Sequence, residues 1–110
     1  MYCQTKQQTM EITQSDRAQQ IKIKKALIQM CQGELESSYK EFTKMKATPK
    51  SLRTVEEQEN VEYYSKHIEW LRKEYAAEMK ELRSMKWEFK AYQALASGNK
   101  YMFNKLMTLA

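Results

Sequence analysis

The sequence predicts an all-α protein, an antiparallel long helical hairpin that is coiled-coil-like and carries a short C-terminal helix. The 110 residues include only two glycines and one proline, which leaves little of the turn chemistry that a many-stranded β fold requires. Met, Glu, Lys, Gln, Leu and Ala are abundant, and all of them favour helices. Along two long stretches apolar residues recur every seven positions, the spacing typical of helices that pack with a left-handed twist.

The first two segments are predicted to be a flexible N-terminal arm at residues 1–12 and a helix at residues 13–46. The arm is polar and lacks a helical period, as is common at chain termini. Thr13 is followed three residues later by Asp16, the spacing of a helix cap and its acidic partner. The helix then carries a row of apolar residues seven apart, and we expect this row to be buried: Ile21, Ile28, Leu35 and Phe42.

A turn at residues 47–53 and a second helix at residues 54–96 follow. The residue before a proline avoids the α region, so the first helix must end before Thr48. The second helix has two possible starts, either Thr48 with Pro49 or Thr54 with Glu57, and the sequence does not choose between them. The second helix has the longer row of residues seven apart: Val61, Ile68, Tyr75, Leu82, Phe89 and Ala96.

The end of the chain is predicted to form a short helix at residues 99–110. Gly98 can adopt the left-handed conformation that ends a helix. The segment that follows is too apolar to stay in water, so it should fold back or enter a partner. Together, the segments from residue 13 to residue 110 are expected to form a single domain.

A short connection makes the two long helices antiparallel neighbours, so their apolar rows should match in reverse order. Phe42 should lie near Val61, and Ile21 near Leu82. Beyond that point the second helix is expected to overhang the first, which leaves Phe89, Tyr92 and Ala96 in need of another cover. The C-terminal helix could supply part of this cover and a second copy of the chain the rest, and we therefore expect an oligomer, with a dimer favoured.

Aromatic and apolar residues away from the predicted seam are candidates for a protein interface, because such side chains are enriched where proteins meet. Together with the overhang and the tail they form the predicted interface set: Tyr63, Trp70, Trp87, Phe89, Tyr92, Tyr101, Phe103 and Leu106.

The net charge of +5 suggests an anionic partner, although it also serves solubility. Residues 1–53 hold ten Lys/Arg against five Asp/Glu, whereas residues 54–110 hold nine of each. Cations gather near the start of the first helix and at the hairpin tip. We predict that they bind nucleic acid or an acidic partner: Lys22, Lys24, Lys25, Lys40, Lys44, Lys46, Lys50 and Arg53.

The catalytic inventory is small and predicts that the protein is not an enzyme. His67 and Asp16 are the single histidine and the single aspartate, and they fall in different helices. No metal-ligand spacing and no phosphate-binding loop occurs, so no metal, cofactor or small-molecule substrate is expected. Cys3 and Cys31 form no disulfide pattern. The chain has no apolar stretch of signal-peptide or membrane-span length, which predicts a protein of the cytoplasm, or of a host cytoplasm.

These features predict a non-enzymatic helical interaction protein that docks on a protein or nucleoprotein partner. One alternative is a nucleic-acid-binding accessory factor. In layout the chain resembles small phage recombination mediators and phage-encoded inhibitors, since it is short, helical and rich in Lys, Glu and Tyr. That resemblance, which is of type and not of motif, implies a further alternative, an inhibitor of a host nucleic-acid enzyme.

Overall fold

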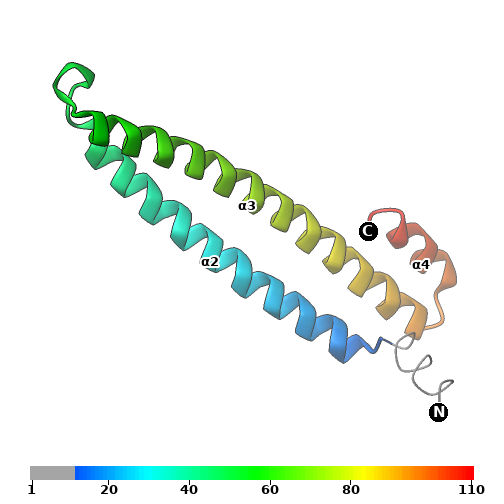
Figure 1. Cartoon of the computed structure of the whole chain (residues 1–110). Helices are drawn as coiled ribbons and strands as arrows, with labels where there is room; N and C mark the ends of the chain where they lie inside the picture. The colour runs from blue at the N-terminus through cyan, green and yellow to red at the C-terminus, as the bar shows by residue number, and fades with distance from the viewer. Residues whose placement is uncertain (1–11) are drawn as a thin grey trace, which may run out of the picture. The chain divides into compact units, whose positions relative to one another are not determined.

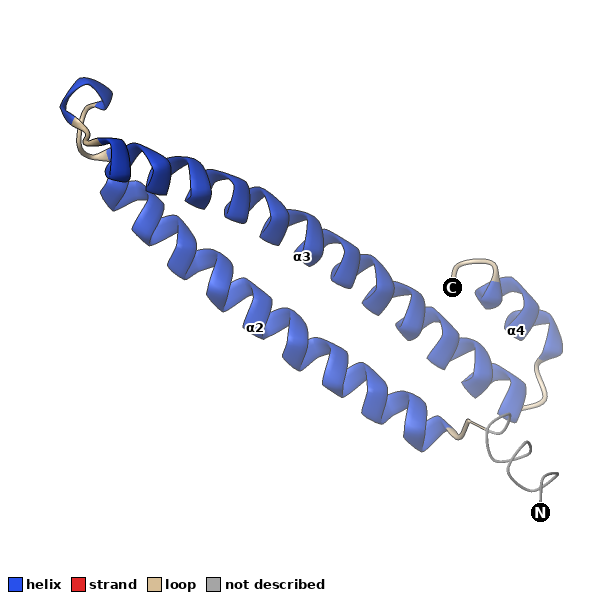
Figure 2. Ribbon diagram, viewed as in Figure 1, coloured by secondary structure: helices blue, strands red, loops and turns tan. Residues whose placement is uncertain are grey.

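The structure is a computed structural model that describes residues 12–110. Most of the predicted N-terminal arm, residues 1–11, therefore lies outside the described residues. The described chain forms the long helices α2 (Gln14–Lys46) and α3 (Val55–Ala96), a short 3-10 turn η1 (Lys50–Leu52) between them, and the C-terminal helix α4 (Lys100–Met107) (Figure 1). Residues 12–110 contain no strand (Figure 2), which confirms the all-α prediction.

The chain divides into two compact units. Unit 1 comprises the residues up to Lys25 together with Lys80–Ala110, and unit 2 comprises Ala26–Met79. Each unit therefore contains a part of α2 and a part of α3. Unit 1 also contains α4, and unit 2 also contains the connection between the two long helices.

The helix starts follow from side chains that satisfy the free backbone N–H groups of the first turn. The Thr13 hydroxyl oxygen accepts a hydrogen bond from the backbone N–H of Asp16 at 3.1 Å, and the Asp16 carboxylate accepts one from the Thr13 N–H at 3.4 Å. At α3, Thr54 accepts from the N–H of Glu57 at 3.1 Å. Thr54 is thus the cap of the second long helix, and Pro49 precedes only the 3-10 turn.

The seam of unit 2 is mostly apolar, with the polar Ser38 also buried, and it follows the predicted antiparallel register. Ile28 from α2 and Val61, Ile68 and Leu71 from α3 are buried, and Leu71 is the largest fully buried side chain of the described chain. The Cys31 thiol donates to the backbone oxygen of Leu71 at 3.9 Å. These contacts place the middle of α2 against the middle of α3 in reverse order, as the matching apolar rows predict.

The seam of unit 1 runs further along α3 than predicted. Leu82 is buried as expected, but the Gln14 side-chain amide also donates to the backbone oxygen of Phe89 at 3.0 Å. The Arg17 guanidinium carbon lies 3.5 Å from the centre of the Tyr92 ring. The prediction that Phe89 and Tyr92 overhang the first helix is therefore wrong, because Gln14 and Arg17 continue the seam with polar side chains.

Helix α4 packs back against the end of α3, one of the two outcomes expected for the apolar tail (Figure 1). Gly98 has a φ of 82°, and the Asn99 N–H donates to the Ala94 oxygen at 2.9 Å, which closes α3. The Asn99 side chain then accepts from the Met102 N–H at 3.0 Å and caps α4. The Phe103 ring meets the Tyr92 ring edge-on with centres 5.2 Å apart.

Candidate functional site

Exposed aromatic rings form a stacked column on α3 in unit 2. The Tyr63 ring is parallel to the His67 ring with centres 5.8 Å apart, and the His67 ring stacks on Trp70 at 6.0 Å. The three residues are spaced by four and three, so they lie on one face of the helix. Tyr63 is 62% exposed and Trp70 is 55% exposed. Two large apolar side chains thus face solvent in a preformed arrangement.

Apolar residues of α2 lie on the same side of unit 2. The His67 Nε2 atom is 3.4 Å from a Glu34 carboxylate oxygen, which fixes the side of the helix pair on which the column lies. Met30 and Leu27 precede Glu34 by one and two helical turns, and both are exposed. We call this surface the aromatic flank and define it by five residues: Leu27, Met30, Tyr63, His67 and Trp70.

A second surface, in unit 1, combines cations with apolar side chains. A pocket of about 290 Å³ is lined by side chains of both helices: Ala18, Ile21, Lys25, Lys86, Phe89 and Lys90. Lys22 lies one turn from both Ala18 and Lys25, and Arg83 one turn from Lys86, so they extend the same face. We call the five exposed cations Lys22, Lys25, Arg83, Lys86 and Lys90 the basic flank.

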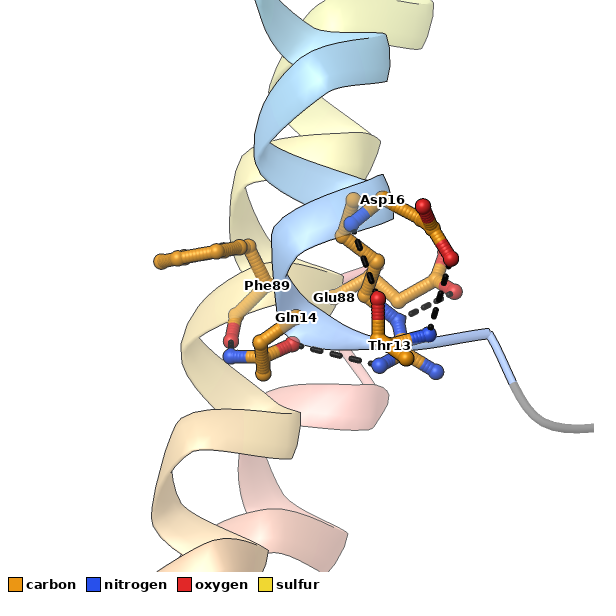
Figure 3. Close-up of polar contacts among 6 residues, drawn as sticks. Thr13, Gln14, Asp16, Glu88 and Phe89 are labelled. Atoms are coloured by element: carbon orange, nitrogen blue, oxygen red, sulfur yellow. Dashed lines mark hydrogen bonds and ion pairs between the residues drawn. The ribbon is translucent and has the colours of Figure 1, made fainter.

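The acidic side chains of unit 1 are engaged outside this pocket. Glu81 pairs with Lys24 at 3.1 Å, and a Glu88 carboxylate oxygen lies 3.8 Å from Arg17 Nε. Asp16 caps the N-terminus of α2. Figure 3 shows Glu88, Thr13 and Asp16 gathered there, with the Phe89 ring pointing away from them. None of these acids lines the pocket, so the charged side chains of its lining are all cationic.

Charge is therefore divided unequally between the two units, and a count by sequence halves does not show this division. The described residues of unit 1 hold ten Lys/Arg against three Asp/Glu, whereas those of unit 2 hold eight against ten. The positive excess of the described chain lies in unit 1. A count by sequence halves hides this because Lys80–Ala110 joins the start of α2 in space.

The predicted basic residues are not equally available. Lys22 and Lys25 belong to the basic flank, but the Lys24 side chain is only 14% exposed and pairs with Glu81. Arg53 stabilises the connection, since its Nε donates to the Thr48 oxygen at 2.9 Å.

At the tip, Lys44 lies 3.5 Å from Glu41, and Lys46 lies over the Phe42 ring at 5.1 Å. Lys40 and Lys50 are exposed. Because unit 2 also contains more acids than cations, the tip is a mixed surface rather than a purely cationic one.

The predicted interface residues separate into different environments. Tyr63 and Trp70 come together in the aromatic flank, and Phe89 lines the pocket of unit 1. Tyr92 and Phe103 pack against each other. Trp87 is half-buried with the Lys90 ammonium 5.0 Å from its ring centre, Leu106 is half-buried, and Tyr101 is exposed.

Several residues of both surfaces were absent from the sequence prediction. Arg83, Lys86 and Lys90 complete the basic flank, and Leu27 and Met30 complete the aromatic flank. The available signal was the set of positions that flank the apolar rows. Had the flanking positions of both helices been aligned in the antiparallel register, the cations of α3 would have appeared beside Lys22 and Lys25.

The remaining chemistry of the described chain is limited. Burial raises the pKa of the Cys31 thiol, and the carboxylates of Glu34, Glu74 and Glu78 raise it further, so this thiol stays protonated at neutral pH. Residues 12–110 contain no cluster of three or more His, Cys, Asp or Glu able to hold a metal ion. Over the same residues, no helix combines the length and apolar character needed to cross a membrane.

Comparison of the chain with protein-family models, with curated proteins and with solved structures gives no match in any of the three. The two surfaces are thus the basis for assigning a function.

Proposed function

We propose that this protein is a non-enzymatic, oligomeric interaction protein, and that the aromatic flank is where it binds a second copy of itself. The observation that carries the proposal is the exposed, stacked column of Tyr63, His67 and Trp70. Tyrosine and tryptophan are enriched among the residues that dominate binding energy at protein interfaces. Their rings here are already ordered by stacking, which lowers the entropy lost on binding.

The charge around the flank supports self-association. In a two-fold dimer the same patch meets itself, so a patch of one sign would repel its copy. Glu34 lies beside the aromatic flank and faces His67, and the other four members of the flank are uncharged. The basic flank of unit 1 has the opposite character, because five cations would oppose five cations. The aromatic flank is therefore the better surface for a homodimer, and the dimer would then dock on a protein or nucleoprotein partner.

Sedimentation across a wide concentration range tests the dimer, with Trp70→Ala as the disrupting variant. Because both copies lose the ring, we expect the dimer dissociation constant to rise by about 30-fold or more, which corresponds to about 2 kcal/mol. Leu52→Ala is the matched control, since Leu52 is 72% exposed and lies on η1. It should dimerise like the parent chain. A parent chain that is monomeric at every concentration refutes the dimer, and a dimer that Trp70→Ala leaves intact refutes the assigned surface.

Docking on a partner is tested by affinity capture from the native host, with the same variants as controls. A protein retained by the parent chain and by Leu52→Ala but lost with Trp70→Ala would support docking that depends on the dimer or its flank. Proteins retained equally by all three chains would count against it. The inhibitor role and a cytoplasmic site of action stay predictions from the sequence.

A further inference from the structure

We infer that the basic flank of unit 1 binds single-stranded nucleic acid, with a base held against Phe89 and the phosphates on the surrounding lysines. This inference does not rest on self-association, because it uses a different unit and a different surface. It also moves the predicted nucleic-acid contact away from the hairpin tip.

The charge of the basic flank favours a polyanion. The flank presents five exposed cations from two helices, and ion pairs within residues 12–110 use none of them. Lys90 lies over the Trp87 ring, a contact that leaves its charge intact. A phosphate backbone gains affinity by releasing counterions to such a surface. The described residues of unit 1 together attract a polyanion, since their cations outnumber their acids by ten to three.

The pocket of unit 1 fits an unpaired base. Its lining combines the apolar side chains of Ala18, Ile21 and Phe89 with three lysines, Lys25, Lys86 and Lys90. Figure 3 shows the Phe89 ring extending sideways from α3, away from the polar cluster at the start of α2. An unpaired base can place its apolar face against such a ring, as bases do on aromatic side chains of proteins that bind single strands. A duplex keeps its bases stacked inside and would leave the pocket empty.

The hydrogen-bonding groups of the pocket distinguish a nucleic-acid strand from an extended peptide. Lysine side chains are donors only, and the three apolar lining residues offer no polar side-chain atom. The helix backbone uses its own carbonyls. An extended peptide would therefore bury N–H groups without acceptors, which costs free energy. A phosphate backbone presents acceptors and no donors, and so it matches the flank.

The basic flank extends along α3. Arg83 and Lys90 are seven residues apart, or about 10 Å along α3. The phosphates of one nucleotide in the pocket cannot contact cations that far apart on α3 together with the two cations of α2. The flank therefore suits several consecutive nucleotides of a strand.

The test measures fluorescence anisotropy of a labelled unstructured oligonucleotide titrated with the full chain at low and moderate salt. Two triple variants carry the same change of charge: Lys25, Lys86 and Lys90 to Gln in the pocket, and Lys40, Lys44 and Lys50 to Gln in unit 2. We expect the pocket variant to lose at least about tenfold in affinity and its salt slope to fall by about 2, since each single-strand phosphate contact contributes about 0.7. The unit 2 variant should stay within about twofold of the parent chain.

Phe89→Leu tests the stacked base while keeping an apolar side chain in the seam. We expect affinity to fall by about 5- to 150-fold, the equivalent of 1–3 kcal/mol per stacked base. Circular dichroism of each variant must match the parent chain, and Phe89→Met replaces Phe89→Leu if that variant does not.

Several results would overturn the inference. Absence of binding at low salt refutes the site, and equal losses in the two triple variants indicate attraction without a site. A mononucleotide that competes as well as the oligonucleotide shows a small-ligand pocket and not a strand site. If a duplex binds as tightly as the single strand and Phe89→Leu has no effect, the inference that a base is held against Phe89 is refuted.

Discussion

Replacing Leu71 with alanine should measure how much the apolar seam of unit 2 contributes to folding. Leu71 is 2% exposed, and its backbone oxygen accepts the Cys31 thiol. Truncating a buried leucine costs about 2.7–5.0 kcal/mol, depending on how far the surroundings collapse. A seam between two helices can relax more easily than a thick core, so we expect a loss near the lower end, about 3 kcal/mol in the free energy of unfolding.

Urea denaturation followed by circular dichroism, at one fixed protein concentration, gives that free energy by linear extrapolation. For a chain of 110 residues, a loss of about 3 kcal/mol corresponds to a fall in Tm of about 10–15 °C. Leu52→Ala removes the same atoms from a side chain that is 72% exposed, and it should cost under about 0.5 kcal/mol. A loss below about 1 kcal/mol for Leu71→Ala, or equal losses in the two variants, would refute a packed seam at this position.

Three further substitutions or reactions test other parts of the fold. Thr54→Ala removes the cap that accepts from Glu57 N–H and should lower the free energy of unfolding by about 1 kcal/mol, whereas Thr54→Ser should keep most of it. Gly98→Ala should destabilise the fold by about 1 kcal/mol or more because Gly98 has a φ of 82°. Gly33→Ala, in mid-helix with open space around the added Cβ, should instead stabilise it by about 0.5–1 kcal/mol. Equal effects of the two substitutions in urea denaturation would contradict the left-handed conformation of Gly98. Alkylation of Cys31 at neutral pH, followed by peptide mass mapping, should be slower in the folded chain than in urea because burial raises the thiol pKa. Because folding raises the pKa of this thiol, its contribution to the free energy of unfolding is complete below the ordinary thiol pKa of 9.0 and is lost as the pH rises through the pKa of the folded state. A folded chain that is alkylated as fast as the unfolded one refutes the raised pKa.

The sequence was sufficient to predict the helices because their signals are local. Thr13 and Thr54 are polar caps followed at the right spacing by acids, and a helix start depends only on such near neighbours. The apolar rows through Ile28 and Ile68 show the buried face of each helix. The choice between Thr48 and Thr54 was the exception, since both have local chemistry for a start and only the folded connection distinguishes them.

The surfaces were harder to predict because they depend on two helices at once. Lys86 and Lys25 are far apart in sequence, and only the antiparallel register brings them to one pocket. The seam of unit 1 was missed for a related reason. Gln14 and Arg17 occupy positions in the seven-residue repeat but are polar, so a search for apolar residues stops before them.

The Tyr92 ring has a consequence for how unit 1 responds to ligands. It meets Arg17 of α2 at 3.5 Å and Phe103 of α4 at 5.2 Å, so one side chain serves two neighbours. Release of α4 would free one side of the ring and weaken its hold on the first turns of α2. Packing of α4 against the Tyr92 ring and packing of the start of α2 against the same ring are therefore thermodynamically linked, and such coupling is reciprocal. A molecule that tightens the start of α2 should therefore slow hydrogen exchange in α4, without touching α4 itself.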